Sequence, residues 1–350
     1  MDEPKRPIRV LVAEDSAVVA RVLVDVLTSD PEIEVVGIAR DGSEAITLTK
    51  SLTPDLITMD VRMPKVDGLV ATRKIMEETP TPIVIVSASV NVQDMNITFE
   101  ALRAGALDII EKPRGVGHKD YEEVRGRLVR AVKLMSEIKV VRRWPEGKFR
   151  RPSRLPRAVL KRREEGRVVF IGCSTGGPAA LEAILGRLPA HFAAPIVVVQ
   201  HIAPGFIGGL VEWLSHVTPL KVKIAEVGET PAAGTVYFAG DAYHLVIDAG
   251  GRLALDDGPP ERGHKPAIDR LLTTGASVWG GRCIGILLTG MGMDGVDGLR
   301  EIRHAGGRTI AQDEKTSVIY GMPKEAVAAG VVDKVSALTD IGPELIALTA

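Results

Sequence analysis

Short runs of β-branched, apolar residues alternate with helix-like segments through most of this chain. In the first half the runs are IRVLVA, VVGIA, DLITM, PIVIVSA and ALDII. Between them, segments such as VVARVLVDVLTS repeat apolar residues at helical spacing. Strands that alternate with helices form parallel sheets, because a parallel pair needs a crossover connection and a helix usually supplies it. The pattern therefore predicts a doubly wound α/β domain.

A second alternating pattern begins after Arg167. The runs RVVFIG, PIVVVQ and CIGILLTG are apolar enough to be central parallel strands. The stretch TVYFAG, followed by HLVIDAGGRLALDD, is typical of a β-hairpin with Gly250 and Gly251 at its turn. We therefore predict α/β architecture in both halves: two doubly wound parallel-sheet domains, the second with an antiparallel hairpin insertion.

Residues 142–166 interrupt this alternation. Three prolines and many Lys and Arg residues fall in this segment, a composition typical of a linker. We expect a first domain at 1–141, a basic, Pro-containing linker at 142–166 and a second domain at 167–350. A solvated linker is the favoured interpretation, and docking of its charge on an acidic partner or a nucleic acid is the alternative.

Composition argues against several classes of protein. The formal net charge is -1 and aromatic residues make up 4%, which disfavours a nucleic-acid partner. No apolar run approaches the ~18 residues of a membrane span, so we expect no membrane insertion. The two cysteines cannot form a disulfide framework. These features predict a cytoplasmic protein.

Carboxylates follow two strands of the first half. Glu14 and Asp15 come directly after IRVLVA, and Asp60 comes directly after DLITM. The carboxyl ends of parallel strands meet at the crevice where doubly wound sheets bind ligands. Because a cluster of carboxylate oxygens suits Mg²⁺, the sequence predicts a magnesium site at this sheet edge.

Two more polar residues end the following strands, Ser87 and Lys112. A hydroxyl, a lysine and Mg²⁺ around one aspartate could form and hold an acyl phosphate, with Asp60 as the nucleophile. Taken singly, Asp15 could cap a helix and Lys112 could be a surface turn residue. Polar residues at successive strand ends favour the phosphorylation hypothesis.

The motifs VAEDS, MDVRMPKVDG, VSAS and EKP resemble the receiver domain of two-component response regulators, over about residues 8 to 140. The resemblance implies phosphoryl transfer from a histidine kinase to Asp60, and phospho-switch roles for Ser87 and Lys112. Ile109 departs from the family, since many receivers carry an aromatic switch residue there. The resemblance further implies four Mg²⁺ ligands: the carboxylates of Glu14, Asp15 and Asp60 and the backbone carbonyl of Arg62.

In the second half, GCSTG fits the G-x-S-x-G pattern of a nucleophile elbow. Such a turn exposes Ser174 above the sheet. The amides near Thr175 and Gly176 begin a helix, and they could stabilise an oxyanion. A helix N-terminus also binds phosphate, so spacing alone favours a nucleophile and a phosphate loop equally.

A nucleophilic serine needs a base and an orienting carboxylate. His201 follows PIVVVQ and Asp294 follows CIGILLTGMGM, so both are expected at the same sheet edge as Ser174. Alone, His201 could be an ordinary polar residue and Asp294 could cap the following helix. His264, in a polar loop, could also line the site. The coincidence of three strand ends favours a Ser-His-Asp triad.

Together, IGCSTGGP, VVVQHIAPGF, VYFAGDAYHL, LLTGMGMDG and AQDEKTSVIYGMPKEA resemble the catalytic domain of the CheB family of chemotaxis protein-glutamate methylesterases. This resemblance covers about residues 167 to 348. It implies that Ser174 attacks the methyl ester of a chemoreceptor glutamate, that His201 takes the serine proton and that Asp294 orients the imidazole. It also implies deamidation of receptor glutamines by the same acyl chemistry.

The same resemblance implies that backbone amides near Thr175 and Met291 hold the oxyanion. It also implies activation of the esterase by phosphorylation. Acyl transfer needs no metal and no ligand cluster is visible in this half of the sequence, so we expect no cofactor there. Cys173 stands where a small alanine is expected, so a thiol nucleophile is a weaker alternative. A response regulator whose second half only binds a partner protein is the competing hypothesis, which a covalent serine probe would distinguish.

Overall fold

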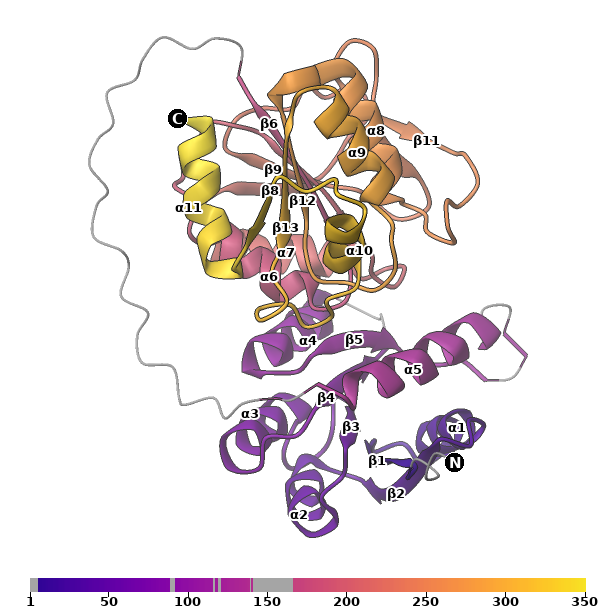
Figure 1. Ribbon diagram of the computed structural model, residues 1–350. Coiled ribbons are helices and arrows are strands. Elements are labelled where there is room, and N and C mark those ends of the chain that lie inside the picture. The colour runs from indigo at the N-terminus through magenta and orange to yellow at the C-terminus, as the bar shows by residue number, and fades with distance from the viewer. Residues whose placement is uncertain (1–5, 89–91, 116, 119–120, 139, 141–165) are drawn as a thin grey trace. The chain divides into compact units, whose positions relative to one another are not determined.

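The computed structural model describes residues 6–88, 92–115, 117–118, 121–138, 140 and 166–350 (Figure 1). The chain divides into two compact units, Met1–Pro152 and Ser153–Ala350. Residues 142–165, which make up nearly all of the expected linker, lie outside the described residues.

The first unit is built on a parallel sheet with the strand order β2-β1-β3-β4-β5. The strands are β1 (Ile8–Ala13), β2 (Ile33–Ala39), β3 (Leu56–Met59), β4 (Ile83–Ser87) and β5 (Asp108–Glu111). Helices follow them in alternation: α1 (Ala17–Thr28), α2 (Gly42–Leu52), α3 (Gly68–Glu78), α4 (Val92–Ala104) and α5 (Tyr121–Met135). Every residue of β3 and β4 is buried, which explains their largely apolar sequences.

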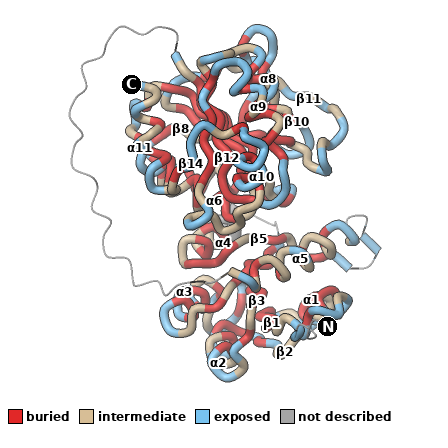
Figure 2. The backbone as a smooth tube through the Cα atoms, viewed as in Figure 1, coloured by how far each residue is buried: buried red, intermediate tan, exposed pale blue. Residues whose placement is uncertain are grey.

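The second unit contains a larger parallel sheet with the order β14-β13-β12-β6-β7-β9-β8. Its central strands are buried along their whole length, as Figure 2 shows. The strands are β6 (Val168–Cys173), β7 (Ile196–Gln200), β8 (Lys221–Ile224), β9 (Thr235–Phe238), β12 (Cys283–Leu287), β13 (Arg308–Gln312) and β14 (Lys334–Ser336). The prediction of two doubly wound parallel-sheet domains is confirmed.

Helices cover this sheet, and α8 packs closely against it at Gly275. A Cβ atom at Gly275 would lie 2.5 Å from the ring of Phe170 on β6, so only glycine allows this contact. The helical elements are α6 (Gly177–Leu185), α7 (Ile207–Val217), α8 (Ile268–Trp279), η1 (Gly280–Arg282), α9 (Val296–His304), α10 (Met322–Ala328) and α11 (Leu338–Thr349). Among the described residues, no helix combines the length and apolar character needed to span a bilayer.

The hairpin insertion exists, but it is smaller than predicted. It consists of β10 (His244–Ile247) and β11 (Leu253–Asp256), which pair antiparallel. Its turn contains Gly251, whose φ of +77° favours glycine. The TVYFAG stretch was wrongly assigned to the hairpin: it forms β9, parallel to β7 and β8 in the main sheet.

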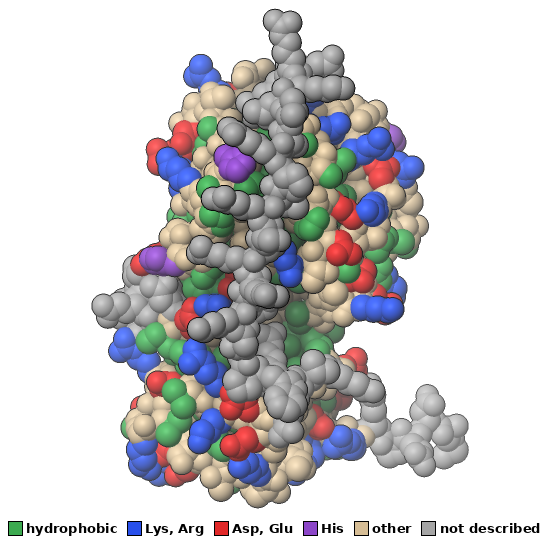
Figure 3. Space-filling model, turned by 90° about the vertical axis from the view of Figure 1, so that its left-hand side faces the viewer, with side chains coloured by type: hydrophobic (Ala, Val, Ile, Leu, Met, Phe, Trp, Pro, Cys, Tyr) green, Lys and Arg blue, Asp and Glu red, His purple; other side chains and the backbone are tan. Residues whose placement is uncertain are grey.

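Edge strands β8 and β14 were absent from the sequence prediction. Most of their residues are exposed or half-buried, so they lack the apolar runs that identify central strands. The face in Figure 3 shows acidic and basic side chains interspersed over the described residues. Such mixing fits the near-zero net charge of the chain.

Candidate active site and acidic cluster

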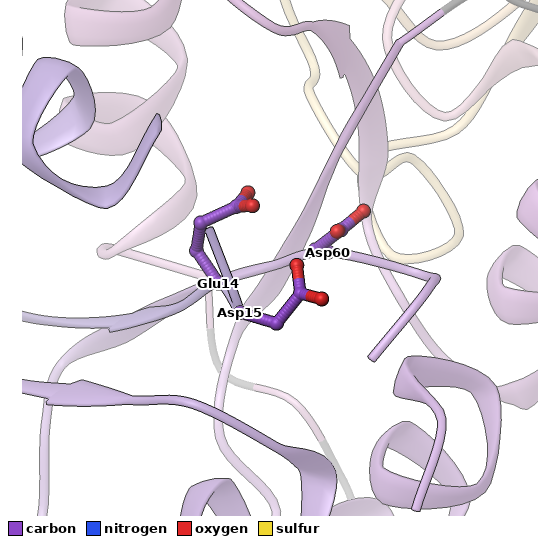
Figure 4. A group of neighbouring side chains, drawn as sticks. All are labelled: Glu14, Asp15 and Asp60. Atoms are coloured by element: carbon purple, nitrogen blue, oxygen red, sulfur yellow. The ribbon is translucent and has the colours of Figure 1, made fainter. Parts of the chain in front are cut away.

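Three acidic residues of the first unit, Glu14, Asp15 and Asp60, lie together at one sheet edge (Figure 4). Glu14 and Asp15 follow β1, Asp60 follows β3, and these strands are neighbours. One carboxylate oxygen from each lies within 4.8 Å of the others. Glu14 and Asp60 are buried, whereas Asp15 is exposed.

Lys112 joins this cluster from the end of β5. Its Nζ lies 2.8 Å from Glu14 Oε2 and 2.8 Å from Asp60 Oδ2. The backbone N–H of Lys112 donates to the carbonyl of Ser87 at 3.0 Å, which places both at the same edge. An open cavity of about 380 Å³ lies beside the cluster, and Asp15 and Arg62 help to line it.

The electrostatics of the cluster favour an added cation. Burial raises the pKa of Glu14, the charge of Asp60 adds to this, and Lys112 offsets part of it. Burial likewise raises the pKa of Asp60, with a further contribution from Asp15. One ammonium group cannot neutralise three carboxylates, and a set of oxygen donors fits Mg²⁺.

In the second unit, Ser174 occupies the turn between β6 and α6. Gly176 is the N-cap of that helix, with φ +76°, and a Cβ atom there would lie 2.7 Å from the Val318 side chain. The N–H of Ser174 donates to the Thr289 carbonyl at 3.0 Å, and its own carbonyl accepts from Gly177 N at 2.8 Å. The backbone of the serine is therefore held from both sides.

His201 begins the loop after β7, and its ring contacts Asp294. Nε2 of His201 lies 2.9 Å from Asp294 Oδ2. Nδ1 is buried and has no hydrogen-bond partner among the described residues. In the usual serine triad the carboxylate binds Nδ1 and the serine faces Nε2. Here the carboxylate binds Nε2, which leaves Nδ1 as the nitrogen able to accept a proton.

Asp294 lies at the N-terminus of α8. Its oxygens accept from the backbone N–H groups of Ile268 at 2.8 Å and Asp269 at 2.9 Å. Burial opposes ionisation, but the hydrogen bond from His201 and these two amides outweigh it and lower the pKa of Asp294. The alternative that Asp294 caps the following helix α9 is wrong, because Gly295 is the N-cap there and no side chain caps it.

His264 lies directly on the ring of His201. The ring centroids are 3.9 Å apart and the planes differ by 3°. The loop that carries His264 is closed by backbone hydrogen bonds with Glu261 in both directions. The stacking restrains the plane of the His201 ring.

The residues expected at the oxyanion site lie on two adjoining segments. The Thr175 carbonyl accepts a hydrogen bond from the Thr289 hydroxyl at 2.9 Å. A Cβ atom at Gly290 would lie 2.6 Å from the Cβ of Ser174, so the turn leading to Met291 packs against the serine. Met291 itself is exposed.

Cys173 is a poor nucleophile in this environment. It is completely buried, and burial raises the pKa of its thiol far above the usual range. Its Sγ donates to Gln200 Oε1 at 3.0 Å. Sequence reasoning missed Gln200, although a polar residue that ends an apolar strand directly before His201 was a usable signal.

Asp269 is expected to make stability depend on pH. Burial, with a further contribution from Asp294, raises its pKa to about 6, above the ~3.9 of an unfolded aspartate. The folded state therefore holds this proton more tightly. The protonated Asp269 carboxyl therefore stabilises the folded state. This contribution to the free energy of unfolding is fully present below about pH 4 and is lost as pH rises through about 6.

Asp269→Asn is therefore expected to stabilise the protein at pH 7.5, by about 1–3 kcal/mol, and to have little effect at pH 4. The asparagine oxygen can still accept the 2.7 Å hydrogen bond from Gly298 N. Denaturant unfolding at the two pH values measures the difference. Asp297→Asn is the matched control. Arg300 and Arg262 lower the pKa of Asp297, so removal of this negative charge should slightly destabilise the folded protein. A destabilised Asp269→Asn at pH 7.5 would contradict the argument.

Comparisons with known proteins cover both units. A family model described as CheB methylesterase matches residues 169–345, and one described as response regulator receiver domain matches residues 10–118. A relative from Nitrosospira multiformis, named protein-glutamate methylesterase/protein-glutamine glutaminase, is 46% identical over 347 residues, covering 98% of this chain and 97% of the relative.

A relative from Myxococcus xanthus, named protein-glutamate methylesterase/protein-glutamine glutaminase 4, is 46% identical over 341 residues. That match covers 97% of this chain and 96% of the relative. The crystal structure of the Thermotoga maritima CheB methylesterase catalytic domain aligns with a TM-score of 0.52 at 40% identity. It covers 53% of this chain and 100% of that one.

Proposed function

The chain belongs to the CheB methylesterase family and carries a response regulator receiver domain, and from this premise we propose that it hydrolyses methyl esters of chemoreceptor glutamates. We propose that it also deamidates receptor glutamines. The observation that carries the proposal is the His201 ring, bound to Asp294 through Nε2 at 2.9 Å, with a buried Nδ1 that finds no hydrogen-bond partner within the described part of the chain. An elbow serine, Ser174, follows the strand next to that of His201.

In the proposed mechanism, Ser174 Oγ attacks the ester carbonyl as its proton passes to His201 Nδ1. The Nε2–H of His201 stays on the Asp294 carboxylate, which stabilises the imidazolium. Backbone amides near Thr175 and Met291 would bind the oxyanion. Collapse of the tetrahedral intermediate expels methoxide, which takes the proton from Nδ1 and leaves as methanol.

Water then resolves the acyl-enzyme. His201 Nδ1 takes one proton from the water as its oxygen attacks the acyl carbon, and returns it to Ser174 Oγ as the ester bond breaks. The product is the receptor glutamate. With a glutamine substrate the first leaving group is ammonia, and the second half of the reaction is identical.

The proposed control element is Asp60, which would accept a phosphoryl group from a histidine kinase. The ligands proposed for Mg²⁺ are Glu14, Asp15, Asp60 and the carbonyl of Arg62. When bound, the cation would offset the negative charge of the incoming phosphoryl group. Lys112, already 2.8 Å from Asp60, would pair with the phosphoryl oxygens, and Ser87 would donate its hydroxyl to them.

The domain organisation is part of the same proposal. We assign the receiver to residues 1–141, a linker to 142–166 and the methylesterase to 167–350. We place the enzyme in the cytoplasm, with methylated chemoreceptors as substrate and a kinase as phosphodonor. Neither nucleic acid nor membrane insertion has a role in this proposal.

Methanol release from methylated chemoreceptor membranes tests the function. The full chain should release methanol, and release should increase when a small-molecule phosphodonor and Mg²⁺ are added. A wild-type enzyme that releases no methanol, with or without the phosphodonor, would contradict the proposed activity. Labelling of Ser174 by a fluorophosphonate without any methanol release would leave a serine hydrolase with another substrate.

Asp60→Asn should abolish the stimulation by phosphodonor while basal methanol release persists. The amide cannot form an acyl phosphate, and it leaves the triad in the other unit unchanged. Rates measured with and without phosphodonor give the result directly. The matched control is Asp25→Asn, an exposed carboxylate on α1 paired with Arg21, which should retain the stimulation. Stimulation that survives Asp60→Asn would place the phosphoacceptor elsewhere.

A further inference from the structure

Gln200 is the last residue of β7, directly before His201. Only 3% of its surface is exposed. It is paired in register with Cys173, the last residue of β6, directly before Ser174. Buried amides need partners for all their polar atoms, so the hydrogen bonds of this side chain show what it holds in place.

Both hydrogens of the Gln200 amide go to the residues of the proposed reaction. Nε2 donates to the carbonyl of Ser174 at 2.8 Å and to the carbonyl of His201 at 2.8 Å. Oε1 accepts from the thiol of Cys173 at 3.0 Å. The amide orientation is determined by these partners, because a flipped amide would place its oxygen against two carbonyl oxygens.

Neighbouring residues leave space for this amide and supply a donor to its oxygen. A Cβ atom at Gly177 would lie 2.0 Å from Gln200 Oε1, so any other residue there would displace the side chain. Cys173 supplies a donor that an alanine would lack.

We propose that Gln200 is a positioning residue that sets the separation of Ser174 from His201, by holding both backbone carbonyls with one amide group. The inference rests on the proposed function of those two residues. The effect should fall on the chemical step, because a displacement of about 1 Å between reacting groups can reduce a rate ~10²-fold.

Gln200→Met tests this, because methionine has similar length and flexibility but no N–H donor. With full-length enzyme and phosphodonor, kcat is expected to fall ~10- to 100-fold with KM nearly unchanged. Labelling by a fluorophosphonate should slow by a similar factor. The acid limb of the pH profile should stay in place, since His201 remains the base. Gln200→Glu, which keeps the shape but places an oxygen against the two carbonyl oxygens, should lose at least as much kcat as Gln200→Met.

Thr309→Val is the control for a general loss of stability. Thr309 is buried at the opposite end of the same sheet, at the start of β13, and its hydroxyl accepts from Asp333 N at 2.9 Å. This variant should lower the unfolding temperature and leave kcat per folded enzyme unchanged. Wild-type kcat and labelling rate in folded Gln200→Met or Gln200→Glu would overturn the positioning role. Wild-type enzyme that is neither labelled nor active would instead overturn the proposed function, and this inference with it.

Discussion

Replacing Ser174 with alanine is expected to lower kcat for methanol release by about 10⁴- to 10⁶-fold, as in other serine hydrolases that lose the nucleophile. The fold should persist, because the backbone of this residue makes the contacts that hold the turn. Its N–H binds Thr289, and its carbonyl binds Gly177 and Gln200. The loss should therefore appear in kcat and in covalent labelling rather than in stability.

Single-turnover assays on methylated chemoreceptor membranes would measure this loss with phosphodonor present. Ser215→Ala, an exposed serine on α7 whose hydroxyl donates to a carbonyl of its own helix, is the matched control and should behave as wild type. If methanol release persisted in Ser174→Ala, the nucleophile would be another residue. Burial makes Cys173 a poor candidate for that role.

Asp294→Asn is expected to reduce kcat by about 10⁴-fold, the size of the effect when a triad aspartate becomes asparagine. All partners of this carboxylate donate to it: Oδ2 accepts from His201 and Ile268, and Oδ1 accepts from Asp269. In one orientation the NH2 group of an asparagine would face the N–H groups of His201 and Ile268, and in the other it would face the N–H of Asp269. The clash with the imidazole N–H is relieved only if the imidazole proton moves from Nε2 to Nδ1. A protonated Nδ1 can no longer accept the serine proton.

Initial rates over a range of substrate concentrations would show whether the Asp294→Asn loss lies in kcat. Asp297→Asn provides the comparison. This residue is three positions along the chain, half-buried, and paired with Arg262 and Arg300. Near-wild-type kcat in Asp294→Asn, with reduced stability, would mean that Asp294 only anchors the start of α8.

The central strands and the chemistry at their ends could be predicted from the sequence. Apolar runs identify strands buried on both faces, and in a parallel sheet the residues after such runs meet at one edge. Glu14, Asp60 and Lys112 were grouped correctly on that basis, and so were His201 and Asp294. The exposed edge strands β8 and β14 gave no comparable signal.

Details that depend on packing between distant segments were not predictable. Asp294 binds the start of α8, which lies 26 residues earlier in the chain, so local sequence pointed to the wrong helix. The contact of Nε2 with the carboxylate depends on the side-chain conformation of His201, and the stacking on His264 joins segments far apart in the chain. Gln200 resembled any polar residue at a strand end until its two carbonyl partners were located.

The carboxylate of Asp294 is shared between an imidazole and two backbone amides at a helix start. Those amides, of Ile268 and Asp269, belong to ordered backbone and exchange no proton in the reaction. A change in the charge of the Asp294–His201 pair changes the chemical shifts of these amides. Their ¹⁵N–¹H resonances are therefore internal probes of the triad, able to follow its ionisation during titration without a label on the histidine.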